Sequence, residues 1–214
     1  MTIEEIREHV LTNDDFVKEE FRKLQYYYGL QRVIRNHLTR PEDIETESVA
    51  EHIYAMGILA NYFSKLEGLE ETLNIAKVHN LILWHDIDEI ETGDIIGYLK
   101  TPEDRQREEE ATGIVLAKSP LLLKNHIEDL LTEYKQQESP EARFVKAIDK
   151  MDPIFHLLNE NGKRLFDLHT ATEDQHSRIK KPYIEAYPYM YRFFVVTTDM
   201  FRAGGYFHPD TANR

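Results

Sequence analysis

The sequence predicts an all-α protein that folds as a single-domain helical bundle. Apolar residues recur at three-to-four-residue spacing along most of the chain, and no segment alternates as a strand would. Helix-start signals, with Ser or Pro ahead of an apolar stripe, occur several times. No repeat, low-complexity tract or Gly/Ser linker divides the 214 residues. A chain of this length fits one domain with one core.

Two helices and a break are expected in the first part of the chain. Residues 14–35 carry apolar side chains at helical spacing, and Arg40-Pro41-Glu42-Asp43 ends that pattern. Ser48-Val49-Ala50-Glu51 is a capping box, in which the Ser hydroxyl accepts from a backbone N–H and the Glu reaches back to the cap. An apolar stripe continues from this box to Phe63, so His52 lies in the first turn of the second helix.

A third helix is expected over residues 71–90. Its apolar positions lead into the polar cluster 85–89, and Gly93 is a natural C-terminal stop. A loop that includes Gly97 follows over residues 94–104.

Further helices are expected in the second half. A charged helix spans 105–117. Ser119-Pro120 and Ser139-Pro140 each place Pro at a first helical position, so they open helices over 121–137 and 140–151.

The C-terminal segment 179–207 is dense in aromatic side chains. Such a stripe more often packs into a core or a dimer interface than binds a ligand. We therefore expect residues 156–207 to pack on the core or to form a homodimer contact.

Composition excludes several classes of function. The formal charge of −13, from 26 basic and 39 acidic residues, disfavours a nucleic-acid partner. With no cysteine, the chain has no disulfide, thiolate nucleophile or Cys-ligated zinc. The N-terminus lacks the apolar region of a signal peptide, and stretches such as Leu81–Trp84 are too short to cross a bilayer. We expect a cytoplasmic protein without a membrane partner.

A polar cluster at the end of the third expected helix is the candidate for chemistry. His85 and Asp86 follow an apolar helix, where neither should face a core without a partner. Glu89 lies four residues after His85, near the same helix face. His52 and Asp149 belong to two other helices, so two imidazoles and two carboxylates would make a divalent-metal site between helices. Spacing alone leaves open whether the four side chains meet.

The order His…His-Asp…Asp, with its flanks, resembles the HD superfamily of metal-dependent phosphohydrolases. More narrowly, it resembles the bacterial 5′-deoxynucleotidase branch and its eukaryotic HD-domain relatives. The matching segments are Thr46–His52, Trp84–Asp94, Arg107–Ala111 and Phe144–Asp149. The likeness covers roughly residues 20–155, and we expect residues 1–214 to form a single HD domain.

By this resemblance, one divalent metal is held by His52, His85, Asp86 and Asp149. The ion could be Mn, Co, Ni, Zn, Fe or Mg, because this ligand set accepts several metals. Glu89 and Asp94 match acidic residues beside the metal, and we expect both to be catalytic. Arg35 matches an arginine that holds the substrate phosphate, with Arg32 as the competing choice.

The implied reaction is hydrolysis of a small phosphorylated substrate, a nucleoside 5′-monophosphate, by metal-activated water. The bacterial enzymes place Trp after the arginine, whereas this chain has Asn36-His37, so no deoxyribose preference is carried over. Two alternatives stay open: an HD hydrolase of a nucleoside triphosphate or alarmone, and a non-catalytic metal-binding interaction protein. The polar set Glu89, Asp94 and Arg35 favours an enzyme, because a purely structural metal site needs no anion clamp.

Overall fold

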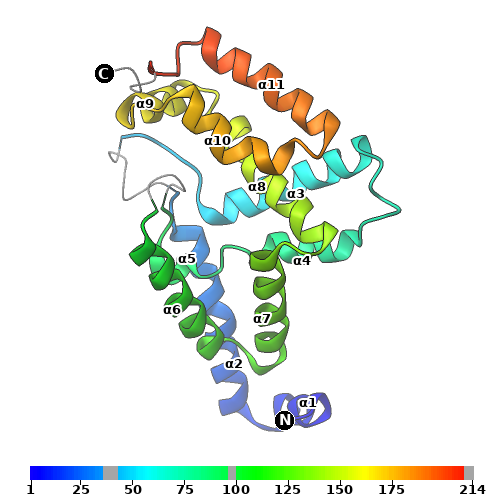
Figure 1. The fold of residues 1–214 in the computed structure, drawn as a ribbon. Helices are drawn as coiled ribbons and strands as arrows, with labels where there is room; N and C mark the ends of the chain where they lie inside the picture. Colours follow the sequence, from blue (N-terminus) through cyan, green and yellow to red (C-terminus); the bar gives the residue numbers. More distant parts are fainter. Residues whose placement is uncertain (36–42, 96–99, 210–214) are drawn as a thin grey trace.

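The computed structural model describes residues 1–35, 43–95 and 100–209, and within these ranges the chain is helical, with only isolated bridges between extended residues (Figure 1). The expected all-α fold class is confirmed. The helices are α1 (Ile3–Thr12), α2 (Asp14–Tyr27), η1 (Tyr28–Arg32), α3 (Val49–Leu66), α4 (Ile75–Trp84), α5 (Glu89–Thr92), α6 (Pro102–Lys118), α7 (Leu121–Gln136), α8 (Pro140–Leu157), α9 (Glu160–Leu168), α10 (Glu173–Ile184) and α11 (Pro188–Ala203). Asn36-His37 and Gly97 lie outside the described residues.

Helix α8 is the centre of the bundle. It contacts α3, α4, α7, α9, α10 and α11, and Figure 1 shows it between the end that holds α2, α6 and α7 and the end that holds α9, α10 and α11. Its apolar side chains, among them Phe144, Val145, Ile148 and Met151, are fully buried. Asp149 lies on this same helix, so the packing of the core fixes the position of a candidate metal ligand.

The capping box at the start of α3 forms as predicted. The Ser48 hydroxyl accepts from the Glu51 N–H at 3.2 Å, and the Glu51 carboxylate accepts from the Ser48 N–H at 2.7 Å. The cap satisfies backbone donors that the first helical turn leaves free. The first turn of α3 consequently carries His52 into the interior, where it is fully buried.

The helix predicted over 14–35 ends early. The α-helix stops at Tyr27, a 3₁₀ turn runs to Arg32, and the next residues are extended. The extended backbone pairs with the segment before α3: the Arg35 N–H donates to the Glu47 carbonyl, and the Val49 N–H donates to the Val33 carbonyl, both at 2.9 Å. This pairing holds Arg35 beside the start of α3.

The helix predicted over 71–90 is divided in two. Asn74 caps α4, which ends at Trp84, and α5 begins only at Glu89. Between them the N–H of Ile87 donates to the carbonyl of Trp84, a tighter bond than that of an α-helix. His85 and Asp86 therefore lie in a turn rather than on a regular helix.

Helices α6 and α8 are longer than the sequence pattern predicted. A capping box between Thr101 and Asp104 starts α6 at Pro102. Helix α8 was predicted to end at Met151, but it continues to Leu157, and Pro153 lies inside it. Proline has no N–H, so Pro153 leaves the carbonyl of the residue four positions earlier without its helical partner.

The aromatic C-terminal segment packs on the rest of the bundle. Helix α10 packs along α8, and α11 contacts α3 and α8. Met190, Phe194 and Phe201 of α11 are buried in the main core. The aromatic side chains of this segment therefore help to hold α10 against α8.

Gly162, in the first turn of α9, has no room for a side chain. A Cβ atom there would lie 1.9 Å from the Leu157 carbonyl oxygen, so the backbone would have to move. We expect Gly162→Ala to lower the free energy of unfolding by about 1–3 kcal/mol, measured by urea denaturation. Gly113→Ala is the control, since nothing lies within 4 Å of a Cβ there. It should stabilise α6 by about 0.5–1 kcal/mol, and equal shifts for the two variants would contradict the prediction.

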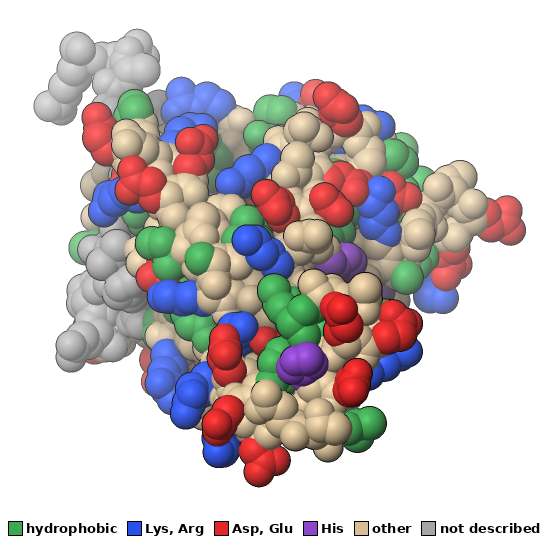
Figure 2. Space-filling model, turned by 90° about the horizontal axis from the view of Figure 1, so that it is seen from below, with side chains coloured by type: hydrophobic (Ala, Val, Ile, Leu, Met, Phe, Trp, Pro, Cys, Tyr) green, Lys and Arg blue, Asp and Glu red, His purple; other side chains and the backbone are tan. Residues whose placement is uncertain are grey.

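Figure 2 shows acidic and basic side chains interspersed over one face of the molecule. Among the described residues, no helix is both long and apolar enough to cross a membrane.

Candidate metal centre

Two buried histidines define the centre. The His52 Nδ1 atom lies 2.7 Å from a carboxylate oxygen of Asp152, and the His85 Nδ1 atom lies 2.9 Å from the Ile82 carbonyl oxygen. These contacts fix the rings so that each Nε2 atom is free for a second interaction, and the ring centroids are 5.5 Å apart. Within the described part of the chain, both Nε2 atoms are buried without a hydrogen-bond partner.

Two carboxylates face these nitrogens. An oxygen of Asp86 lies 3.0 Å from the His85 Nε2 atom and 3.8 Å from the His52 Nε2 atom, and an oxygen of Asp149 lies 3.7 Å from the same His52 atom. Ligand atoms that share one ion at about 2.1 Å each lie roughly 3–3.5 Å apart. Orphaned imidazole nitrogens beside paired carboxylates therefore fit a divalent metal, and the structure brings all four predicted ligands together.

The second oxygen of Asp149 is fixed by other groups. It accepts a hydrogen bond from the Tyr134 hydroxyl at 3.1 Å and pairs with the ammonium groups of Lys146 and Lys150, each at 3.0 Å. Burial alone would raise the pKa of this carboxyl, but the two ammonium groups hold it well below its usual range. Asp149 is therefore an oriented, ionised candidate ligand.

The imidazole of His52 lies in a carboxylate-rich setting. Burial and Arg35 lower its pKa, but Asp149, Asp152 and Glu47 outweigh them and raise it well above the usual value. In the metal-free protein these carboxylates stabilise a proton on the ring. A cation bound at its Nε2 atom would neutralise the same excess of negative charge.

Glu89 and Asp94 are both buried beside this centre. Burial, Asp86 and Asp94 raise the pKa of Glu89 well above its usual value. Within the described ranges, one Glu89 carboxylate oxygen is buried without a hydrogen-bond partner. Asp94 lies 3.6 Å from the Nε atom of Arg35. The structure thus brings both predicted acidic residues to the cluster.

Of the two candidate arginines, only Arg35 lies in the site. Its guanidinium is 3.1 Å from Glu47, 3.6 Å from Asp94 and 3.7 Å from Asp152. Arg32 is exposed at the end of η1. Burial lowers the pKa of Arg35, but the carboxylates around it raise the pKa above its usual value, so the side chain stays charged.

Residues 28–190 match the family model of the HD domain. The chain belongs to the HD-domain family. The 5′-deoxynucleotidase HDDC2 of Bos taurus is 33% identical to it over 69% of this chain and 73% of that protein. The Mus musculus protein of the same name is 32% identical over 73% and 79% of the two chains.

Solved structures share the fold of this HD domain. The structure of a predicted metal-dependent phosphohydrolase from Magnetospirillum magnetotacticum has a TM-score of 0.75 and covers 90% of this chain and 96% of its own, at 23% identity. An HD-domain phosphohydrolase from Listeria innocua has a TM-score of 0.56 at 20% identity, over 85% of this chain and 84% of its own.

The HD-domain motif did not reveal several charged side chains around the centre. Lys146 and Lys150 flank Asp149 by three positions and one, so their proximity to it was readable from helical spacing. Glu47 belongs to the matching segment Thr46–His52, but the resemblance assigns it no role. Lys180 gave no local signal, because it comes from α10 and approaches the site only through tertiary packing.

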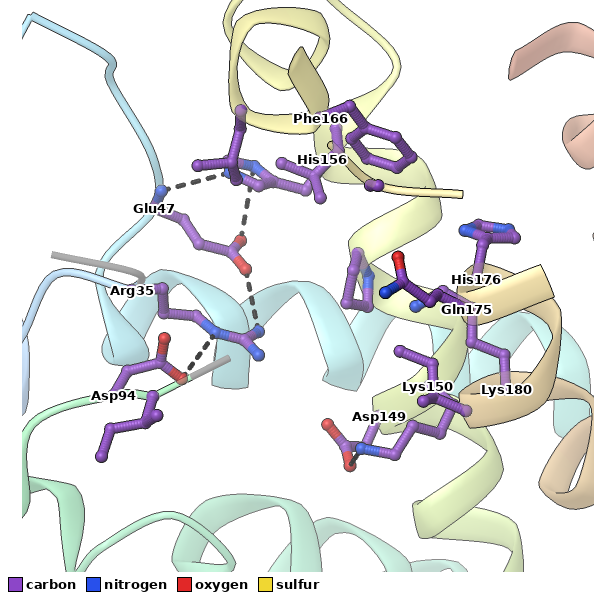
Figure 3. A pocket seen from close by; sticks show the side chains of 16 residues that line it. Arg35, Glu47, Asp94, Asp149, Lys150, His156, Phe166, Gln175, His176 and Lys180 are labelled. Carbon is purple, nitrogen blue, oxygen red and sulfur yellow. Dashed lines mark hydrogen bonds and ion pairs between the residues drawn. The ribbon is translucent and has the colours of Figure 1, made fainter. Parts of the chain in front are cut away.

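A cavity of about 140 Å³ extends the HD-domain site from Asp149 towards α9 and α10. One water needs only about 10–15 Å³ of such space, so the cavity has room for a small organic ligand. Figure 3 shows Arg35, Glu47 and Asp94 on one side, and Lys150 and Lys180 on the other. The candidate metal centre therefore opens onto a cavity with cations on two walls.

Proposed function

We propose that this HD-domain protein is a metal-dependent phosphohydrolase that converts a nucleoside 5′-monophosphate into a nucleoside and phosphate. The observation that carries the proposal is the pair of orphaned Nε2 atoms of His52 and His85, which face two carboxylates at the end of a ligand-sized cavity. Relatives about 30% identical over two thirds or more of the chain are 5′-deoxynucleotidases, which supports a nucleotide as the substrate.

We propose that His52, His85, Asp86 and Asp149 hold one divalent metal ion. When bound, such an ion lowers the pKa of a water molecule and polarises a phosphoryl oxygen. The chain itself supplies the orientation of the ligands: Asp152 fixes His52, the Ile82 carbonyl fixes His85, and Lys146 and Lys150 fix Asp149.

Three further residues would act on the substrate. Arg35 orients the phosphate, and its fixed geometry comes from Glu47 and Asp94. Glu89 accepts the proton of the attacking water, because its carboxylate is buried beside the centre with one oxygen unengaged within the described ranges. A bond forms between the water oxygen and phosphorus, the bond to the 5′ oxygen breaks, and that oxygen takes up a proton. Asp94 lines the cavity, and in this proposal it holds a sugar hydroxyl or assists this leaving group.

A nucleotide panel tests the proposal. The protein is stripped of metal, reloaded separately with Mn, Co, Ni, Zn, Fe or Mg, and incubated with ribo- and deoxyribonucleoside 5′-monophosphates, triphosphates and an alarmone. We expect inorganic phosphate from monophosphates with at least one metal and none from the stripped protein. Pyrophosphate or triphosphate as the main product would replace the proposal with the alternative hydrolase. No release from any nucleotide would leave a metal-binding protein without this activity.

A further inference from the structure

Lys180 is a buried lysine whose ammonium group has no counter-ion in contact among the described residues. Its side chain lies on α10, is only 7% exposed and lines the cavity that opens from the metal centre. Among the described residues, no hydrogen bond or ion pair engages its ammonium group. Taking an ammonium group out of water without a partner is unfavourable. An anion that enters the cavity would supply the missing counter-charge.

The other cations of the cavity are already engaged. Arg35 pairs with Glu47 and lies near Asp94, and Lys150 pairs with Asp149. A phosphate monoester brings up to two negative charges into a site that is already rich in carboxylates. Lys180 is the lining lysine whose charge is not matched within the described part of the chain, and Figure 3 shows it on the wall across from Arg35.

A bound anion would shift the charge state of Lys180. Burial and the nearby Lys150 lower its pKa to about 7. Near neutral pH the amine is therefore balanced between its charged and neutral forms. A bound anion favours the charged form, so binding and protonation support each other.

We propose that Lys180 is a substrate-binding residue whose ammonium group contacts a phosphate oxygen from the wall of the cavity opposite Arg35. This inference rests on the proposed function and deepens it by assigning a second cation to the phosphate. Apolar side chains of the same cavity, including Leu157, Phe166 and Ile179, would take the uncharged part of the ligand. The two cations then fix the phosphate between them, with Asp149 below.

The test uses inorganic phosphate as the probe and the full-length, metal-loaded protein. Lys180→Met keeps the length of the side chain and removes its charge. Isothermal titration should show phosphate binding weakened by about 10-fold to 100-fold, the range for a lost hydrogen bond to a charged group. With a nucleoside monophosphate, KM should rise by a similar factor while kcat changes little. Lys180→Arg should recover part of the phosphate affinity.

Lys181→Met is the matched control, because Lys181 is the exposed neighbour on the same helix. It should bind phosphate as the unmodified protein does. Thermal unfolding of Lys180→Met should show an intact fold, and Lys180→Gln serves as a second neutral variant. Wild-type phosphate affinity in both neutral variants would overturn the assignment, as would an unmodified protein that binds no phosphate. Phosphate binding is measured without turnover, so failure of the nucleotidase proposal remains a separate result.

Discussion

Replacing Asp86 with alanine is expected to release the metal and to lower phosphate release from a nucleoside monophosphate by about 10³-fold or more. Asp86 lies within 3.8 Å of both orphaned histidine nitrogens, so its loss removes the carboxylate that bridges the two rings. Metal activation of water and substrate is worth several kcal/mol, and each 1.36 kcal/mol is a factor of ten in rate. Metal content by elemental analysis and initial rates of phosphate release measure the two effects together.

Asp129→Ala is the control for the Asp86 substitution. Asp129 is exposed on α7, away from the cavity, and the same change there should leave metal content and rate as they were. Thermal unfolding of both variants shows whether the fold is retained. An Asp86→Ala protein that keeps one equivalent of metal and its full rate would remove Asp86 from the ligand set.

Glu89→Gln is expected to keep the metal and to lower kcat by about 10²-fold to 10⁴-fold, the usual contribution of a general base. Glutamine keeps the shape of the side chain but cannot accept the proton of the attacking water. The rate of the unmodified protein should rise with pH as Glu89 loses its proton, and this acidic limb should be absent from the variant. Steady-state rates across a pH series, with metal content determined in parallel, measure both effects.

Glu91→Gln is the matched control, since Glu91 contacts Tyr26 and Lys118 outside the cluster. Its activity should equal that of the unmodified protein. A Glu89→Gln protein with undiminished kcat would exclude Glu89 as the base and leave it an orienting role.

Glu89→Gln, which is expected to lower kcat, is expected to raise the stability of the metal-free protein. Because burial, Asp86 and Asp94 raise the pKa of Glu89, the folded state binds more protons than the unfolded state between the two pKa values. The contribution of Glu89 to stability therefore falls as pH rises from its unfolded pKa of about 4.3 towards the folded value. Glu89→Gln lacks this penalty. Its melting temperature should therefore exceed that of the unmodified protein by more at pH 8 than at pH 5.

Local signals in the sequence predicted the helices whose ends are set by local chemistry. Ser48 and Ser139 each cap a helix where the pattern placed one, because a side-chain oxygen that satisfies free backbone donors needs only its near neighbours. The four predicted ligands lie together for a related reason. Histidine and aspartate side chains that the fold takes largely out of water require polar partners, and here His52, His85, Asp86 and Asp149 lie beside one another.

Features that depend on tertiary contacts were not predictable in this way. The apolar pattern of 71–90 continues through Trp84, but the chain turns there, and the His85 ring is held at the Ile82 carbonyl oxygen. Arg35 lies outside the helix that the sequence predicts for it, because its backbone N–H donates to the Glu47 carbonyl. Lys180 belongs to a helix with an ordinary polar sequence, and only the packing of α10 on α8 turns its side chain into the cavity.

The central position of α8 links metal affinity to hydrogen exchange. Amides of a helix enclosed by neighbours on most sides exchange with solvent mainly through global unfolding. A metal that binds only the folded chain lowers the equilibrium constant of unfolding by a factor of 1 + [metal]/Kd. The deuterium uptake of α8 peptides, followed as free metal is raised, would therefore report the dissociation constant of the ion without any substrate.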